Sequence, residues 1–586
     1  MSKPSTKDLI KTFWSFMRGN RIAIYISLML MMFTLGFELL LPIILERGLI
    51  HVRADEIEAL KKAALLYLLV VAGEFVSRFS FSYLISIALL KTINRVRAHV
   101  FNHVLRMKMA FFDREPVGRL LTRTINDCEA LGEVLRAGSA TILVDVLTVV
   151  GIFAIMIHLD LRLTLVMVIV APVVWMVTRW AGQKLRQKFL DVRKALAESN
   201  GFMAEGIHGA EIIQLFNKQD HSAKEYRAIN RVYRNATITS NVYDALLYSF
   251  MDAIAAIASA AVLYAAFNVR FGLVEVATVI VYLRLIEKIF IPIRDLSGKF
   301  AILQQAMAAW ERISGLLVVD GHIVQGDGEV DTKALNIAFD KVGFRYQADG
   351  PLVLNDIHFE VASGQVLALV GQTGSGKSTI GKLLTRAYDG YQGSIHVGGM
   401  ELRDWNYHAL RANIAVVHQD VELFPGSLRD NISMYNPNIG DEKIFWAIDL
   451  VKARHMVDTL QGGLDFEVRE NGGNLSAGQM QLIVFARALA HDAPIVLMDE
   501  ATSSVDSVTE GWIQEAIFEI FKHKTVVIVA HRLSTIAAAD QILVLKDGEV
   551  VERGSHQQLV SMEEGYYASL VQASHDQQGD STSVLI

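Results

Sequence analysis

The chain has 586 residues, of which 52 % are hydrophobic and only 20 % are charged, and its formal net charge is −6. Because soluble globular domains carry about 25 % charged residues, this composition excludes a purely soluble protein. The negative net charge argues against a nucleic-acid partner, and a single cysteine, Cys128, excludes an internal disulfide framework. We therefore expect an integral membrane protein with a soluble part.

The N-terminal half of the chain contains the apolar runs. Residues 1–20 are polar and basic, and we expect them to form a cytoplasmic segment. The first apolar run is too long for a signal-peptide core, so we expect it to stay as a membrane helix. Crossing the hydrocarbon core takes about 20 mostly apolar residues. We predict six such helices, near residues 22–45, 63–90, 137–158, 163–178, 245–267 and 274–293.

Two long basic segments, residues 91–136 and 179–244, separate these helices. Basic loops remain on the cytoplasmic side, so both segments, the N-terminus and the C-terminal part are predicted to lie inside. The segments are too long for structureless connections in a compact protein. We expect helical arms that extend about 30–45 Å past the membrane and turn near residues 113–118 and 201–209. Ordinary cytoplasmic hairpins without a coupling role are the alternative.

Several charged residues fall in or near the predicted membrane helices, where each is costly to insert. Two explanations stay open for them. They form structural ion pairs at helical spacing, as for Glu74 with Arg78 or for Arg284 and Lys288 around Glu287, or they contact a transported substrate. The set consists of Glu38, Glu74, Arg78, Asp145, Asp252, Arg284, Glu287 and Lys288.

The composition changes after the last predicted membrane helix. We predict that the transmembrane domain covers residues 21–319 and that a linker with Gly and Asp covers residues 320–333. A soluble α/β domain then follows over residues 334–572. The polar tail, residues 573–586, is expected to be disordered.

A phosphate-binding loop is predicted near the start of the soluble domain. The apolar run 366–370 indicates a buried strand, and a helical pattern follows the loop, which is the context that the G-x-x-x-x-G-K-[ST] motif requires. Backbone N–H groups of such a loop surround phosphate oxygens at a helix N-terminus. Lys377 is expected to reach the β- and γ-phosphates of ATP, and the Ser378 hydroxyl to bind Mg²⁺. The loop comprises Gly371, Gln372, Thr373, Gly374, Ser375, Gly376, Lys377, Ser378 and Thr379.

Two further apolar runs end in residues suited to phosphate chemistry. The run 494–498 leads into Asp499 and Glu500. Asp499 fits the acid that holds Mg²⁺, and Glu500 stands where a carboxylate can orient or deprotonate the attacking water. The run 525–530 leads into His531, which is expected at a ligand-binding strand end. Taken alone, such a histidine is more often a hydrogen-bonded structural residue than a γ-phosphate sensor.

The sequence Leu475-Ser476-Ala477-Gly478-Gln479 resembles the signature motif of ATP-binding cassette (ABC) transporters. Its distances from the phosphate loop and from Asp499 are similar to those of that family. Tyr346 looks like the aromatic that stacks on adenine, and Gln419 like the catalytic, Mg²⁺-contacting Q-loop glutamine. Alone, Tyr346 could be a core aromatic and Gln419 a loop cap. His531 looks like the switch histidine, residues 503–506 like the D-loop, and residues 467–472 like the segment that touches the transmembrane arms.

This resemblance covers nearly the whole chain and implies an exporter half-transporter, similar to bacterial multidrug and lipid exporters. The implied fold is an all-α six-helix membrane domain with long cytoplasmic arms, fused to an α/β P-loop ATPase domain. Two chains are required, because the signature residues of one chain contact the ATP of the other; these residues are Ser476, Ala477, Gly478 and Gln479. The family more often has Gly at position 477 and Ser-Ala-Leu-Asp in the D-loop, so a homodimer and a heterodimer both stay open.

The resemblance favours ATP-driven export of hydrophobic or amphipathic compounds by alternating access of a dimer, with Glu500 catalysing hydrolysis. A translocase for lipids or lipid-linked molecules and an uptake system, for example for metal chelates, are alternatives. A cassette without transport is disfavoured, because Glu500 is present. The expected location is a bacterial inner membrane, with the ATPase domain in the cytoplasm. The motifs do not specify the substrate or the direction of transport.

Overall fold

The computed structural model divides the chain into two compact units, Met1–Leu105 with Val117–Asp320, and Arg106–Pro116 with Gly321–Ile586. We describe each unit by itself. The structure describes residues 13–53, 56–137, 139–267, 276–319, 321, 326–328, 335–347, 349–419, 421–499, 507–530, 532–562 and 564–572.

The first unit is entirely helical over the residues that the structure describes. Six of its helices are longer than 20 residues, and each covers all or most of one predicted membrane segment: α2 (Arg21–Arg53), α3 (Ile57–Leu105), α7 (Ser139–Leu159), α8 (Leu161–His208), α10 (Gln219–Phe267) and α11 (Val276–Leu317). The shorter elements are η1 (Met17–Asn20), α5 (Val117–Leu121), the π-helical η2 (Thr122–Asn126), α6 (Asp127–Ala137) and α9 (Ala210–Leu215).

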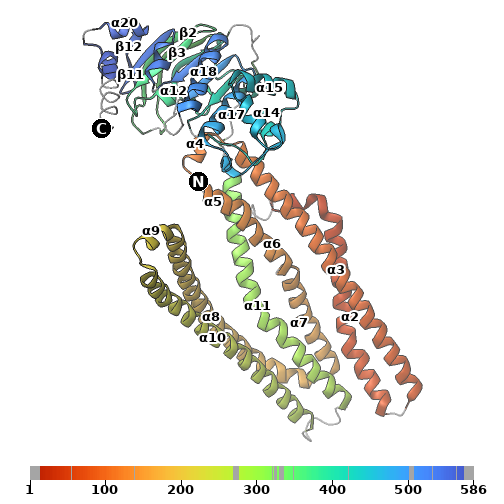
Figure 1. Cartoon of the computed structure of the whole chain (residues 1–586). Helices are drawn as coiled ribbons and strands as arrows, with labels where there is room; N and C mark the ends of the chain where they lie inside the picture. The colour runs from red at the N-terminus through yellow and green to blue at the C-terminus, as the bar shows by residue number, and fades with distance from the viewer. Residues whose placement is uncertain are drawn as a thin grey trace. The chain divides into compact units, whose positions relative to one another are not determined.

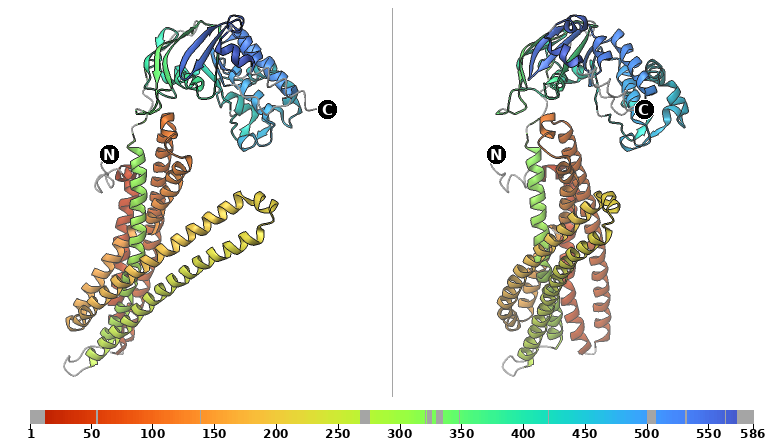
Figure 2. Two further views of the ribbon diagram at one scale, coloured as in Figure 1. Left: turned by 90° about the vertical axis from the view of Figure 1, so that its left-hand side faces the viewer. Right: turned by 60° about the vertical axis from the view of Figure 1, so that its left-hand side comes forward.

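Long helical arms are present, as predicted, because α3, α8 and α10 continue without a break beyond their apolar segments. Figures 1 and 2 show α8 and α10 side by side, with α9 at the tip of the hairpin. The turn that was predicted near residues 201–209 lies at the C-terminal end of that range. Gly201 and Gly206 lie inside α8, and the turn begins only at Gly209. A glycine within a helix costs only about 1 kcal/mol, which the packing of two long helices can offset.

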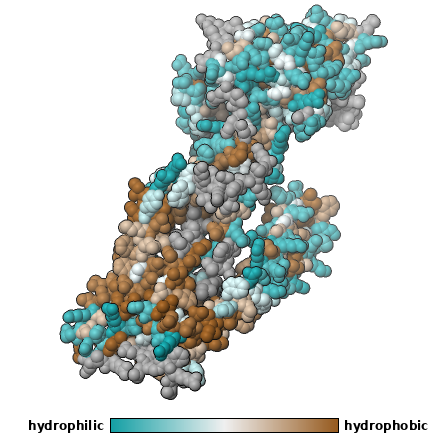
Figure 3. All heavy atoms as spheres, turned by 180° about the vertical axis from the view of Figure 1, so that it is seen from behind, coloured by the Kyte–Doolittle hydropathy of each residue, from teal (hydrophilic) through white to brown (hydrophobic). Residues whose placement is uncertain are grey.

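Much of one face of the helical unit is apolar. Figure 3 shows hydrophobic side chains gathered over it, whereas hydrophilic residues dominate the surface of the α/β domain. Among the described residues, three helices are long and apolar enough to cross a membrane, namely Phe13–His51, Leu161–His208 and Gln219–Phe267, and a shorter apolar helix covers Val144–Leu159. A large apolar surface of this kind suits contact with lipid rather than water.

The helices of this unit are paired and share a core. Helices α2 and α3 pack along their length, as do α8 and α10, and α11 contacts α2, α6, α7 and α10. The main cluster of buried side chains joins α7, α8, α10 and α11 and includes Met156, Leu163, Met251, Tyr282 and Leu285. These four helices therefore share one hydrophobic core.

The second unit is an α/β domain with a central six-stranded sheet in the order β12-β11-β3-β10-β9-β6. Strands β11, β3, β10, β9 and β6 are parallel to one another, and β12 is antiparallel at the edge. A four-stranded antiparallel sheet (β2-β1-β4-β5) and the β7–β8 pair complete the strands. The strands are β1 (Ile337–Phe344), β2 (Leu354–Val361), β3 (Val366–Gly371), β4 (Gln392–Val397), β5 (Met400–Glu401), β6 (Ile414–Val417), β7 (Gly426–Ser427), β8 (Glu467–Val468), β9 (Ile495–Asp499), β10 (Thr525–Val529), β11 (Gln541–Lys546) and β12 (Glu549–Gly554).

The central strands are apolar throughout because both faces of the sheet are covered. Along β3, Val366, Ala368 and Val370 join one buried cluster, while Leu367 and Leu369 join the cluster on the other side. The covering elements include α12 (Lys377–Leu384), α13 (Tyr407–Ala412), α14 (Leu428–Ser433), α15 (Asp441–Leu450), α16 (Arg454–Thr459), η3 (Gly463–Asp465), η4 (Glu470–Gly472), α17 (Ala477–Ala490), α18 (Ser507–His523), α19 (Leu533–Ala537) and α20 (His556–Val560). The predicted fold class, a helical membrane domain fused to an α/β domain, is confirmed.

One short segment from the N-terminal half packs with the α/β domain. The helix α4 (Met109–Phe112) belongs to the second unit, although the sequence predicted it as part of the transmembrane domain. The Lys108 side chain forms an ion pair with Asp389 at 3.1 Å, and Ala110 contacts the core of the domain. The predicted linker also packs there in part, because Gly328 exchanges backbone hydrogen bonds with residues 404–406.

Candidate functional site

The phosphate loop connects the end of β3 to the start of α12, as the motif predicts. Gly371 and Gly376 have φ angles of +151° and +100°, a region that favours glycine. A Cβ at Gly371 would lie 2.2 Å from the carbonyl oxygen of Leu545, and one at Gly376 would lie 2.6 Å from Leu354. Both positions therefore require glycine for backbone conformation and for space.

Lys377 lies inside this loop. Its side chain is buried, and its ammonium donates hydrogen bonds to the carbonyl oxygens of Gly371 (2.6 Å) and Gln372 (2.9 Å). Burial lowers the pKa of Lys377, and the nearby charge of Asp499 opposes that shift. The ammonium is thus held by loop carbonyls, at a position from which it can reach an anion bound by the loop.

A hydroxyl and a carboxylate face each other beside the loop. Ser378, in the first turn of α12, donates to Oδ2 of Asp499 at the end of β9, over 3.3 Å. This donor set fits Mg²⁺, which prefers oxygen ligands and usually binds one or two protein groups together with substrate phosphates. Among the described residues, no group of three or more His, Cys, Asp or Glu side chains could hold a metal alone.

Four neighbouring parallel strands point their carboxyl ends at this site. In sheet order, β6 is followed by Gln419, β9 ends in Asp499, β10 precedes His531, and β3 ends at Gly371. Ligands of open α/β sheets bind outside these strand ends. Gln419 is exposed there. Glu500 and His531, which we predicted to be catalytic, lie outside the residues that the structure describes.

Tyr346 lies next to the phosphate-loop helix. Its hydroxyl is 3.0 Å from Oγ1 of Thr379, and its ring makes edge contacts with Phe344 and Tyr388, each at 5.0 Å between centroids. The side chain is half-buried. The ring therefore packs in part against the core, and its stacking on adenine stays a prediction.

The signature motif begins α17. The Ser476 hydroxyl accepts a hydrogen bond from the Gln479 N–H (3.2 Å), and the Gln479 side chain accepts one from the Ser476 N–H (2.9 Å). Ala477 is exposed and Gly478 is buried. This capped helix N-terminus is favourable for an anion. Within the part of the chain that the structure describes, no hydrogen bond links it to the phosphate loop of the same chain.

Two residues that the sequence did not single out connect α4 to Tyr346. The Tyr388 hydroxyl donates to Oδ2 of Asp113, just after α4, while the Tyr388 ring contacts Tyr346. Burial, and then the hydrogen bond to Asp113, raise the pKa of Tyr388, so it stays a neutral donor. The only sequence signal for this link between α4 and Tyr346 was an aromatic residue, Tyr388, shortly after the phosphate-loop helix α12.

The intramembrane charges are paired. Arg78 contacts Glu74 (2.9 Å) and Glu38 (3.5 Å), and Lys288 contacts Glu38 at 3.6 Å. Arg284 and Glu287 pair along α11 at 3.3 Å. Asp145 pairs with Lys299, and Asp252 also has an interaction partner. The seven charged residues of this set other than Asp252 are therefore ion-paired, but Lys288 reaches Glu38 on α2 instead of joining Arg284 around Glu287.

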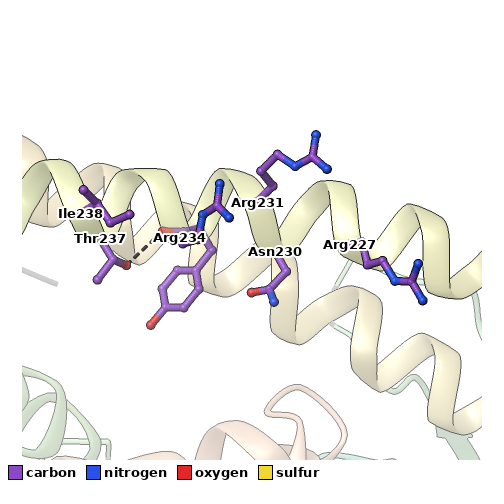
Figure 4. A pocket seen from close by; sticks show the side chains of 7 residues that line it. Arg227, Asn230, Arg231, Arg234, Thr237 and Ile238 are labelled. Carbon is purple, nitrogen blue, oxygen red and sulfur yellow. Dashed lines mark hydrogen bonds between the residues drawn. The ribbon is translucent and has the colours of Figure 1, made fainter.

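A surface hollow on the arm of α10 is separate from these sites (Figure 4). Its lining comes from this helix alone and includes Arg227, Arg231 and Arg234 around Tyr233 and Thr237. The lining is basic, as is typical of cytoplasmic segments next to a membrane. A single helix encloses no ligand, so we assign no binding role to this hollow.

Comparison with known proteins gives two family matches. The ABC transporter transmembrane region matches residues 23–293, and the ABC transporter family matches residues 354–503. The ABC transporter ATP-binding protein YknV of Bacillus subtilis (strain 168) is 33 % identical over 483 residues, which is 82 % of this chain and 80 % of that protein. The ATP-dependent lipid A-core flippase of Yersinia pestis bv. Antiqua (strain Antiqua) is 33 % identical over 509 residues, or 86 % and 87 % of the two chains.

A solved structure shares the fold. The structure of a bacterial Atm1-family ABC exporter with ATP bound matches with a TM-score of 0.76 and 22 % identity, over 94 % of this chain and 98 % of that chain. At this identity the match establishes the architecture alone. The match spans both the helical unit and the α/β domain.

Proposed function

Because this chain belongs to the ABC transporter family, we propose that it hydrolyses ATP to export hydrophobic or amphipathic compounds across a membrane. The observation that carries this proposal is the cluster of Lys377, Ser378 and Asp499 at the ends of β3 and β9. The same chain has a helical unit with a largely apolar face. The relatives are bacterial, which supports an inner-membrane location with the ATPase domain in the cytoplasm.

The residues of the site suggest how ATP is handled. Backbone N–H groups of the loop and the start of α12 would bind the phosphates, and Lys377 would neutralise their charge. Mg²⁺, when bound, would polarise the phosphate oxygens, and Ser378, Asp499 and Gln419 would hold it. Glu500 would accept a proton from the water that attacks the γ-phosphate, with ADP as the leaving group and His531 near the γ-phosphate.

A second half-transporter chain would complete each site. The chain has one phosphate loop and one signature. In a dimer, the capped N-terminus of α17, with Ser476 and Gly478, would meet the ATP held by the partner. ATP would then hold two cassettes together, and hydrolysis would release them. Nothing in these motifs requires two different chains, so we propose a homodimer first.

Nucleotide state would be coupled to transport through α4. This helix is continuous in sequence with α3 and packs on the α/β domain through Lys108 and Asp113. Tyr388 contacts both Asp113 and Tyr346. Closure around ATP would therefore displace α4 and, through it, the membrane helices.

Replacement of Tyr388 by phenylalanine is expected to uncouple the two parts. The ring contact with Tyr346 stays, while the hydrogen bond to Asp113 is lost. We expect ATP affinity to change less than about threefold, while stimulation of the ATPase by transported compounds falls strongly, since a hydrogen bond to a charged group contributes about 1.5–3 kcal/mol. The ratio of stimulated to basal ATPase rate in lipid nanodiscs measures this.

Tyr391→Phe is the matched control, because its hydroxyl donates to Glu401 at 2.7 Å within the α/β domain. This variant should lower thermal stability without changing the stimulation ratio. Equal stimulation ratios in Tyr388→Phe and the wild type would contradict the coupling role of Tyr388.

Lipid translocation is a second candidate. It is favoured by several relatives that are ATP-dependent lipid A-core flippases, at 32–34 % identity. An amphipathic lipid also suits a membrane domain whose helices carry charged groups within apolar segments.

The proposed function is tested by ATPase turnover of this chain alone in nanodiscs, with and without an amphipathic dye or a lipid analogue. We expect ATP turnover that increases when a transported compound is added. Stronger stimulation by the dye favours export of amphipathic compounds, and stronger stimulation by the lipid analogue favours lipid translocation. A folded sample that binds ATP without turnover would contradict the homodimer. Turnover that no amphipathic compound alters would contradict transport of such compounds.

A further inference from the structure

Four charged side chains from three helices meet within the predicted membrane segments. They are Glu38 on α2, Glu74 and Arg78 on α3, and Lys288 on α11. We call them the charge quartet. Its formal net charge is zero, with two carboxylates and two cations. The neighbouring Arg284–Glu287 pair is also neutral and leaves this balance unchanged.

The quartet is unevenly bonded. The Arg78–Glu74 contact is 2.9 Å, whereas Glu38 is 3.5 Å from Arg78 and 3.6 Å from Lys288. Charge-assisted hydrogen bonds are normally about 2.7–2.9 Å long. Glu38 therefore lies between two cations without a tight bond to either, and it can change partners at small cost.

The cations of the quartet are also its accessible part. The side chains of Arg78 and Lys288 are 59 % and 38 % exposed, compared with 18 % for each of the two glutamates. An incoming molecule thus meets positive charge first, with Glu38 directly behind it. This order suits a head group whose anion binds the cations while a second, positive part reaches Glu38.

An apolar surface lies beside the quartet on α3. Phe75 and Phe79 follow Glu74 and Arg78 by one residue each, so they form the neighbouring stripe of the helix. Their rings stack 6.5 Å apart, and the side chains are 70 % and 63 % exposed. Charge and exposed aromatic surface therefore adjoin, as an amphiphile requires.

We infer that the charge quartet binds the zwitterionic head group of an amphiphile, with its phosphate or carboxylate on Arg78 and Lys288 and its ammonium on Glu38. A zwitterion exchanges partners with Glu38 and leaves every charge compensated. A purely anionic or cationic head group leaves one net charge in a region of low dielectric constant, which is strongly unfavourable. This inference rests on the proposed function, because it names the class of compound that the transporter accepts.

The test measures binding without ATP, by native mass spectrometry of the chain in the uncharged detergent dodecyl maltoside. The probes are dioleoyl phosphatidylethanolamine, dioleoyl phosphatidylglycerol and a dioleoyl trimethylammonium lipid. We expect the zwitterionic lipid to bind about tenfold more tightly than either charged lipid, a difference of about 1.4 kcal/mol. A single-chain sulfobetaine tests whether the site accepts any zwitterionic amphiphile or only a lipid. If it binds as tightly as dioleoyl phosphatidylethanolamine, the site accepts amphipathic zwitterions in general; if it does not bind, the site is specific for a lipid.

Two isosteric variants make the charge rule falsifiable. Glu38→Gln leaves the quartet with a net charge of +1 and should shift the preference to phosphatidylglycerol. Lys288→Gln leaves it at −1 and should shift the preference to the cationic lipid. Glu58→Gln, which removes a charge from the exposed Glu58–Lys61 pair at the start of α3, should leave the wild-type order unchanged.

No preference for the zwitterion in the wild type would overturn the inference. So would variants that weaken all three lipids equally while still binding ATP, because that result indicates a purely structural network. Failure of the proposed function gives a different result from failure of this inference. If the lipid preferences follow the charge rule while no compound changes ATP turnover, the binding site stands and the transport proposal falls.

Discussion

Replacement of Lys377 by alanine is expected to remove most of the ATP affinity of this chain. The ammonium is buried in the phosphate loop, where it is bound by the carbonyls of Gly371 and Gln372. Since a hydrogen bond from a charged group contributes about 1.5–3 kcal/mol, the loss should be about 10-fold to 100-fold in affinity. Equilibrium binding of a fluorescent ATP analogue to the purified chain measures it.

The control for this variant is Lys522→Ala, which removes an exposed lysine from α18 of the same domain. It should bind ATP as the wild type does. If Lys377→Ala kept full affinity while its melting temperature was unchanged, the loop would not be the nucleotide site, and the assignment of the whole cluster would be wrong.

Replacement of Glu500 by glutamine is expected to separate ATP binding from hydrolysis. The amide keeps the size of the side chain beside Asp499 but cannot accept a proton from water. General base catalysis typically contributes about 10²–10⁴-fold, so turnover should fall by that factor. ATP affinity should stay within about threefold of the wild type, and dimers holding ATP should accumulate. Phosphate release and size-exclusion chromatography with ATP measure the two effects.

Glu442→Gln provides the matched substitution on α15, where an exposed carboxylate lies in the first helical turn. It should leave turnover unchanged. A Glu500→Gln chain that still hydrolysed ATP at the wild-type rate would assign the base to another residue and would remove Glu500 from the mechanism.

The local parts of the site were predictable because their information is local. The strand, loop and helix around Lys377 lie within 20 residues, and the motif itself contains the glycines that have positive φ there, namely Gly371, Gly374 and Gly376. The meeting of Ser378 and Asp499, 121 residues apart, was also predictable, because both follow parallel strands whose ends meet at one edge of the sheet. Glu500 and His531 remain predictions.

The docking of α4 could not be predicted. Asp113 and Tyr388 are 275 residues apart, and neither lies in a repeated or periodic pattern. Such contacts depend on how whole elements pack, which no short window of sequence records. The charged residues in the membrane helices also include one local contact that the sequence predicted and one long-range contact that it did not. The Glu74–Arg78 pair follows from helical spacing, whereas the contact of Lys288 with Glu38 depends on the packing of α11 against α2.

The central claim is that ATP hydrolysis at this chain's own site drives transport. Its most direct test is uptake of an amphipathic dye into sealed proteoliposomes that expose the ATPase domain, with ATP outside. We expect the dye to accumulate inside the proteoliposomes with ATP, but not with a non-hydrolysable ATP analogue and not with the Glu500→Gln variant. Equal accumulation in the wild type and in Glu500→Gln would contradict it, because movement of the dye would then not depend on hydrolysis.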